Sequence, residues 1–277
     1  MQNNRTLTLI IVALVILTAA LIYLNFQPSE SSVDLQSTNF NTEAKAFDYD
    51  YFVKNSKDSL KPETKLRIDS LEQIAQNDTG NYQANMLLAR IWGDEGQSLI
   101  SANYLFEIAS HLGDARSYKN AGFKYYEYVA LSNDSVSQMY AVRKAIAALE
   151  KVVAIDGNDL EAKNIIARCY IQNDLDVMRG VQTLLDIVKR DSNNTPAVGA
   201  LGELAMRSGQ WEKARQRFEK LTRLEPLNSE AYFYLGEAYA SLTMKKQAIM
   251  AYETSKSLLK DEASKQEIEK IIQALKK

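Results

Sequence analysis

The sequence predicts an all-α protein built from repeated helix pairs, and three observations support this. The 277 residues include only 11 glycines and 4 prolines, too few for many short strands joined by tight turns. Ala, Leu, Glu, Lys and Gln, which all favour helices, are plentiful. Two adjacent segments, 195–228 and 229–262, also align at a spacing of 34 residues. We therefore expect helices throughout the body of the protein and a repeated unit within it.

Composition and charge limit the function classes. Hydrophobic residues make up 46% of the chain, which allows a real core. The 33 Lys and Arg are balanced by 35 Asp and Glu, so no positive field favours nucleic acid as a partner. The lone cysteine, Cys169, rules out an internal disulfide and a cysteine-based zinc site.

The N-terminal segment is expected to cross a membrane. From Thr6 to Phe26 there are 21 residues without a formal charge, 12 of them Leu, Ile or Val. As a helix this segment would span about 31 Å, close to the thickness of a bilayer core. A cleaved signal peptide is the alternative, but its apolar region is only about 7–15 residues long. Here Ala19 and Ala20 are followed by Leu-Ile-Tyr-Leu, so an uncleaved transmembrane helix at 6–26 is favoured.

The flanks of this helix predict its orientation. Residues 27–42 contain no Lys or Arg, whereas Arg5 precedes the helix. The positive-inside rule then places residues 1–5 in the cytoplasm. We expect a single-pass protein of the inner (cytoplasmic) membrane, with its body in the periplasm.

Residues 27–57 are expected to form a flexible tether that ends in an aromatic segment, Phe-Asp-Tyr-Asp-Tyr-Phe at 47–52. Asp48 and Asp50 could suggest a cation site, yet two carboxylates are too few for calcium. The favoured interpretation is an aromatic clip, in which Phe47, Tyr49 or Phe52 packs against the first helices.

The two aligned segments carry small residues where paired helices would meet. Glycine at 202 and 236, and alanine at 214 and 248, would let the two helices of each pair approach closely. A proline two residues before the end of the first segment would stop its second helix. The matched positions are Leu201, Gly202, Ala214, Phe218 and Pro226 in the first repeat and Leu235, Gly236, Tyr239, Ala248 and Tyr252 in the second.

The pattern continues upstream with insertions. Segment 160–194 carries Ala167 and Gly180 at the small positions, and segment 115–159 carries Gly122 and Ala145 with 11 additional residues between the marks. Eleven residues are close to three helical turns, so the helices can lengthen without rotating their buried faces. Segment 81–114 matches more weakly, which gives about five helix pairs.

Capping helices are expected at both ends of the repeats. In the N-terminal cap, 58–80, Pro62 would begin the helix, with Leu66, Leu71, Ile74 and Ala75 on one apolar face. In the C-terminal cap, 263–277, the apolar face would consist of Ile268, Ile271, Ile272 and Leu275.

The repeat positions resemble the tetratricopeptide-repeat pattern, W-x2-L-G-x2-Y, then A-x3-F, then P, with Val198 and Tyr232 in place of the tryptophan. The resemblance covers residues 81–262. It implies a right-handed superhelical solenoid whose first helices line a concave groove for a protein or peptide. Membrane-anchored bacterial proteins of this type act in envelope assembly, secretion or cytochrome maturation.

Groove positions can be assigned from the first helix of each pair. The candidate protein-binding residues are Lys119, Phe123, Asn164, Arg168, Glu203, Phe233 and Glu237. We expect Lys119, Arg168 and Phe233 to line one channel. The alternative is that Lys119 and Arg168 are ordinary solvated charges on the helix surface. The Lys-Asn-Arg clamp that binds chaperone tails in some family members is not reproduced.

No catalytic constellation is present. His111 and Cys169 are the only residues of their types and lie 58 positions apart, so a Cys–His nucleophile is not expected. Buried packing is favoured for Cys169, and a place near a helix C-terminus, before Gly113, for His111. The sequence predicts a membrane-tethered scaffold without enzymatic activity, metal or cofactor. The alternative is a self-associating structural subunit of an envelope complex.

Overall fold

The computed structural model describes residues 47–77 and 82–276, whose regular structure is entirely helical, with thirteen helices. No helix in these residues combines the length and the apolar character needed to cross a bilayer. The predicted transmembrane helix at 6–26 and the first part of the tether lie outside the described residues.

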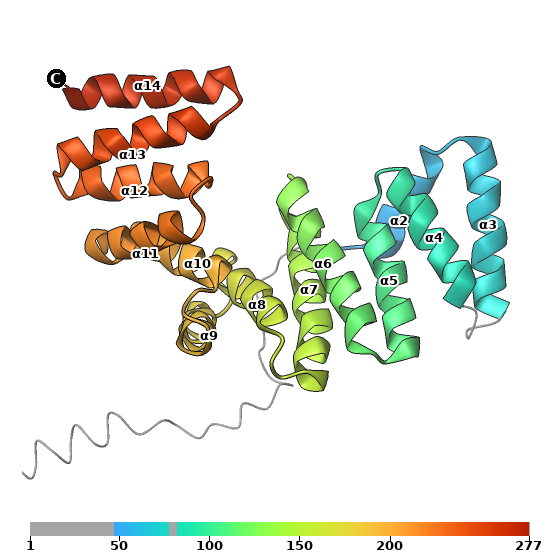
Figure 1. Ribbon diagram of the computed structural model, residues 1–277. Coiled ribbons are helices and arrows are strands. Elements are labelled where there is room, and N and C mark those ends of the chain that lie inside the picture. Colours follow the sequence, from blue (N-terminus) through green and yellow to red (C-terminus); the bar gives the residue numbers. More distant parts are fainter. Residues whose placement is uncertain (1–46, 78–81, 277) are drawn as a thin grey trace, which may run out of the picture. The chain divides into compact units, whose positions relative to one another are not determined.

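Ten of the helices form five consecutive pairs. Their bounds are α4 (Tyr82–Asp94) and α5 (Ser98–Leu112), α6 (Ala115–Leu131) and α7 (Ser135–Ile155), α8 (Leu160–Gln172) and α9 (Val177–Arg190), α10 (Thr195–Arg207) and α11 (Trp211–Leu224), and α12 (Ser229–Ser241) and α13 (Lys245–Leu258). They are flanked by α2 (Tyr49–Asp58), α3 (Pro62–Asn77) and α14 (Glu262–Lys276). From α3 onward each helix packs against the next one in the chain (Figure 1). The prediction of an all-α protein of helix pairs is confirmed, and the superhelical hand stays a prediction.

Asp and Asn side chains begin many of the helices. The Asp159 carboxylate accepts a hydrogen bond from the Ala162 backbone N–H at 2.9 Å, and Asn194 and Asn228 cap α10 and α12 in the same way. Such caps satisfy backbone donors that have no partner inside the helix. At the other end, α11 stops at Leu224, just before Pro226. Local sequence signals therefore set the length of each helix.

A small residue facing a large one fixes the spacing within the pairs. A Cβ added at Gly202 would lie 2.9 Å from the Phe218 ring, and one at Gly236 would lie 2.8 Å from the Tyr252 ring. At Gly122 the nearest atom would be Leu149 Cγ at 2.6 Å. In α8 and α9 the glycine lies on the second helix instead, where a Cβ at Gly180 would approach the Ala167 carbonyl oxygen to 2.7 Å. The remaining small or apolar repeat positions are buried: Ala145, Ala167, Leu201, Ala214, Phe218, Leu235, Ala248 and Tyr252.

The pair α6–α7 is longer than the others. α6 has 17 residues where α10 has 13, and α7 has 21 where α11 has 14. When Gly122 is aligned with Gly202, and Ala145 with Ala214, the added residues fall at 128–131 and 135–141. The insertion predicted at 115–159 is therefore helical. It adds about one turn to α6 and about two to α7, which keeps the buried faces in phase.

The segment predicted as tether and clip contains a helix that the sequence analysis did not anticipate. Asp48 caps α2 by accepting from the Tyr51 backbone N–H at 2.9 Å, so this carboxylate serves the helix. The Phe47 ring lies 4.8 Å from Tyr140 of α7, and Tyr49 stacks on the same ring at 5.7 Å. Phe47 and Tyr49 thus reach past the first helices to the second helix of the long pair, whereas Phe52 packs against the first helices, as the predicted clip would.

The predicted buried face of the N-terminal cap is wrong in part. Leu66 and Ile74 are 68% and 45% exposed, whereas Ile68 is fully buried with Leu88 and Trp92 of α4. Each helical residue turns by about 100°, so Leu66 and Ile68 point to different sides. In α14, Ile268 and Ile272 are buried against Ala248 and Tyr252, as the pattern predicts.

Candidate functional site

Three successive first helices, α8, α10 and α12, are neighbours and share a pocket of about 310 Å³. We call it the Arg168 pocket and define it by Arg168, Gly199, Glu203, Glu230 and Tyr234. Of the lining residues, Gly199 has no side chain and Ala231 has only a methyl group, so they leave room between the helices. The pocket is a surface that the internal packing of the helices leaves open.

Arg168 is the cation of this pocket. Its Nη2 lies 3.6 Å from Glu203 Oε1, an ion pair too long for a hydrogen bond. Burial disfavours the charged guanidinium, but Glu203, Tyr126 and Glu230 outweigh it and raise the pKa of Arg168. Arg168 therefore stays charged, although its side chain is only 27% exposed.

Tyr234 is held rigidly among carboxylates. Its ring stacks on Phe218 at 5.2 Å and meets the edge of Phe233 at 5.9 Å. Burial raises the pKa of the Tyr234 hydroxyl, and the negative charges of Glu230, Glu203 and Glu237 raise it further. Carboxylates from α10 and α12 thus lie close enough to act on this ring.

Glu237 lies three residues after Tyr234 on α12 and is half-buried. Burial raises the pKa of its carboxyl, because removal from water disfavours the charged form. Within residues 47–77 and 82–276, no ion pair or hydrogen bond compensates this side chain. It is an acceptor that the described part of the protein does not use.

A second pocket of about 320 Å³ adjoins the first. We call it the Phe233 pocket and define it by Phe233, Tyr234, Leu259, Ile268 and Ile271. It lies between α12 and the capping helix α14, and its walls are mainly apolar. Glu230 and Tyr234 line both pockets, so one layer of side chains separates them.

Lys119 and Phe123 lie elsewhere, at the junction of α6 and α8. Lys119 Nζ is 2.9 Å from Asp159 and 2.7 Å from Glu161, and it also lies 5.5 Å from the centre of the Phe123 ring. These contacts hold the cation within the protein. Of the residues predicted to share one channel, Arg168 and Phe233 line adjoining pockets, and Lys119 is engaged in this separate ion-pair cluster.

Asn164 is 4% exposed and joins two helix pairs. Its Nδ2 donates to Asn194 Oδ1 at 3.2 Å, and the same oxygen caps α10 by accepting from Ala197 N–H at 3.2 Å. The arrangement fits a packing role better than ligand contact.

Sequence reasoning missed Glu230 and Tyr234. Both lie on the face of α12 that carries Glu237, at positions 230, 234 and 237. That spacing is the signal that could have found them. It also missed a pocket of about 710 Å³ bounded by α2, α3, α4 and α5, because α2 was not anticipated. Some of its polar groups pair with one another, as Glu72 does with Lys57 at 2.7 Å and with the Tyr104 hydroxyl at 3.2 Å.

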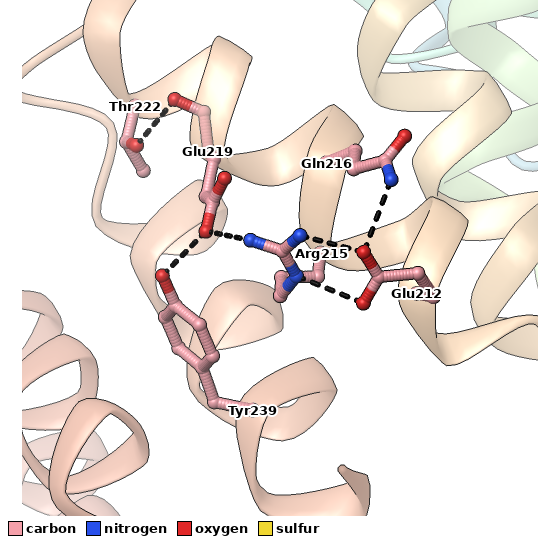
Figure 2. A network of polar contacts seen from close by, with 6 residues as sticks. All are labelled: Glu212, Arg215, Gln216, Glu219, Thr222 and Tyr239. Atoms are coloured by element: carbon pink, nitrogen blue, oxygen red, sulfur yellow. Dashed lines mark hydrogen bonds and ion pairs between the residues drawn. The ribbon is translucent and has the colours of Figure 1, made fainter. Parts of the chain in front are cut away.

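A polar network joins α11 to α12, and none of its members lines either pocket. Arg215 lies between Glu212 and Glu219, and the Tyr239 hydroxyl donates to Glu219 at 2.7 Å (Figure 2). Hydrogen bonds from Arg215 and Gln216 lower the pKa of Glu212 to about 2. Every charged member has a partner, so we interpret this network as a structural link between consecutive pairs.

Cys169 and His111, the candidate reactive residues, both occupy structural positions. Cys169 is 1% exposed, and burial raises the pKa of its thiol to about 12, so the nucleophilic thiolate does not form at neutral pH. His111 lies in the last turn of α5, before Gly113 with φ 68°. In the described ranges, no three His, Cys, Asp or Glu side chains are placed to hold a metal ion.

Part of the chain matches a known repeat family. Residues 200–254, from within α10 to within α13, match the tetratricopeptide-repeat family. This stretch therefore carries the tetratricopeptide-repeat pattern, whose helix pairs stack into solenoids. No curated protein matches this chain significantly in sequence.

Solved structures with a similar fold include MamA, with a TM-score of 0.50 at 17% identity, covering 62% of this chain and 94% of that chain. MamA 41-end from Desulfovibrio magneticus RS-1 has a TM-score of 0.50 at 16% identity, covering 64% of this chain and 94% of that one. YrrB, described as a tetratricopeptide-repeat protein with an unusual peptide-binding site, has a TM-score of 0.47 at 14% identity, covering 73% and 99%. At these identities the MamA structures show a shared fold alone.

Proposed function

We propose that this protein is a membrane-tethered, non-catalytic scaffold that binds a segment of a partner protein across the first helices of its repeats. The observation that carries the proposal is the Arg168 pocket, to which three successive pairs contribute. The charged groups there line open space, and the ion pair between Arg168 and Glu203 is long, at 3.6 Å. The charged groups at the junction of α6 and α8 and those linking α11 to α12 pair closely with one another.

The membrane tether and the compartment are part of the proposal. Their support is the sequence: an uncharged apolar segment at 6–26, followed by residues 27–42 without Lys or Arg. We place the body in the periplasm, in an envelope complex. Full-length protein should fractionate with membranes at full mass, and a mature form starting near residue 20 would contradict the anchor.

The alternative function is a self-associating structural subunit of an envelope assembly, secretion or cytochrome-maturation complex. Sedimentation of the purified full chain in detergent distinguishes the two. Concentration-dependent oligomers that resist charge changes in the Arg168 pocket would favour the structural role.

Photo-crosslinking tests the scaffold function directly. A photoreactive amino acid at Glu203, which lines the Arg168 pocket, should give a discrete adduct with a partner in the producing cell. The matched control is the photoreactive amino acid at position 213, because Lys213 is exposed on the second helix α11. This control should give no adduct.

Adding Arg168→Ala and Phe233→Ala to the Glu203 probe should abolish the adduct while circular dichroism and the thermal melt stay unchanged. Truncation of a central Arg or aromatic residue in an interface lowers the binding free energy by roughly 2 kcal/mol or more. Undiminished crosslinking by the folded double variant would move the binding surface away from the two pockets.

A further inference from the structure

We infer that the partner segment carries a basic side chain and, within a few residues of it, a bulky apolar side chain, the first bound in the Arg168 pocket and the second in the Phe233 pocket. This rests on the proposed function and adds the chemistry of the partner.

The two pockets form one composite surface. Glu230 and Tyr234 line both, so a bound chain passes from one to the other over the Tyr234 side chain. An extended backbone advances about 3.3 Å per residue, and the next side chain on the same face follows two residues later. A separation of roughly two to four residues between the two anchors therefore suits adjoining pockets.

The charge of the Arg168 pocket selects a cation. Glu203, Glu225 and Glu230 line it against the single cation Arg168, and Glu237 adds a further carboxylate nearby on α12. The negative charges outnumber the positive one, so a Lys or Arg from the partner completes the balance.

An acidic partner side chain is disfavoured at the same place. A carboxylate that approached Arg168 would also meet Glu203, which lies 3.6 Å from the guanidinium, and Glu230, which acts on the same group. Like charges brought together in a partly desolvated pocket oppose binding. Arg168 is thus better placed to hold the carboxylates in position than to bind an anion.

The Phe233 pocket selects an apolar side chain. The Phe233 ring is fixed edge-on between Tyr252 at 5.6 Å and Tyr234 at 5.9 Å. Leu259 and Ile271 are only partly buried and complete an apolar wall beside it. Leu, Ile, Met or Phe from the partner would cover this wall, because burial of apolar surface is favourable in proportion to area.

Selection from a random decapeptide library tests the inference, with the full-length chain in detergent as the target. The expected result is enrichment of peptides in which Lys or Arg stands two to four positions from Leu, Ile, Met or Phe. Binding should be lost with Glu203→Ala plus Phe233→Ala, which removes one carboxylate and the aromatic wall, and kept with the control Lys213→Ala.

A charge swap sharpens the test. For one selected peptide, Lys→Glu should weaken binding to the wild type at least tenfold, measured by fluorescence anisotropy. Binding of this Lys→Glu peptide should recover against Glu203→Lys plus Glu230→Lys. If that variant loses helicity, Glu203→Gln plus Glu230→Gln should still remove the preference for a basic peptide.

The outcomes separate the two ideas. Acidic or uncharged peptides that depend on Arg168 and Phe233 would overturn the inferred chemistry and leave the scaffold function in place. Selected peptides that bind the double alanine variant as well as the wild type would overturn both.

Discussion

The pairs α10–α11 and α6–α7 use the same interhelical contact but differ in length. In the first, Gly202 faces Phe218, and in the second, Gly122 faces Leu149. The added turns of α6 and α7 leave this contact unchanged and bond to each other instead, as when the Tyr128 hydroxyl donates to Ser137 at 2.7 Å. The contact between a glycine and a large side chain therefore sets the helix spacing, whereas the helices can lengthen and so provide extra surface.

The two regions use their surfaces differently. Tyr140 lies in the added turns of α7, where it receives Phe47 and Tyr49 and donates to Asn103 at 3.0 Å. The regular helix α10 has no such extension and contributes Glu203 to an open pocket. The long pair thus binds another part of its own chain, whereas in the proposed function the pairs α8–α9, α10–α11 and α12–α13 offer a surface to a partner.

The largest expected effect on stability comes from a change within the pair α10–α11. Ala214 is fully buried between α10 and α11, so Ala214→Glu should destabilise the protein by about 3–5 kcal/mol through a buried charge without a partner. The midpoint of urea unfolding measures this. Lys213→Ala, one residue earlier and exposed, should stay within about 0.5 kcal/mol. Equal midpoints for the two variants would contradict the packing of Ala214 between α10 and α11.

Next in size is a direct test of the shared contact. Gly202→Leu and Gly122→Leu should each cost about 1–3 kcal/mol or more by overpacking, since even a Cβ would approach Phe218 to 2.9 Å and Leu149 to 2.6 Å. Similar losses in urea unfolding would support one spacing rule for both pairs. A neutral Gly122→Leu beside a damaging Gly202→Leu would show that the long pair is spaced by its added turns.

A smaller effect concerns the contact that only the long pair makes. A double-mutant cycle of Phe47→Leu and Tyr140→Leu should give a coupling energy of about 0.5–1.5 kcal/mol, as for other aromatic pairs. Hydrogen exchange of α2 amides should rise in each single variant and rise no further in the double. Coupling indistinguishable from zero would remove the added turns as the binding surface for Phe47.

The smallest effect should depend on pH. The pKa of Glu212 is lowered to about 2 from its usual 4.5, so its contribution is complete above about pH 4.5 and is lost as the pH falls toward 2. The gap in unfolding midpoint between wild type and Glu212→Gln should therefore be present at pH 6 and close near pH 2. A gap that persists at pH 2 would point to packing rather than charge.

The sequence predicts the helix pairs well because their determinants are local. Gly202 and Phe218, like Gly236 and Tyr252, recur at one spacing, and Asn194 and Asn228 mark the helix starts. The same reasoning could not predict α2, whose Tyr49 stacks on Tyr140 far along the chain.

The other misses have the same origin. Leu66 and Ile68 are both apolar, and only the position of α4 decides which of them is buried. In the candidate site, sequence placed Arg168, Glu203 and Phe233 at the pockets but missed Glu230 and Tyr234. Which face of α12 meets the pocket depends on how neighbouring pairs stack, and no single repeat encodes that.

The contact of Phe47 and Tyr49 with Tyr140 has a mechanical consequence. A pull on the chain ahead of Phe47 would load these rings before it reached α3, because they join the start of the described chain to α7. The rings would slide apart and α2 would peel away first, since a partly buried aromatic cluster yields before a packed helix pair. The repeats that carry the two pockets would then stay folded under a tension that extends only the leading helix.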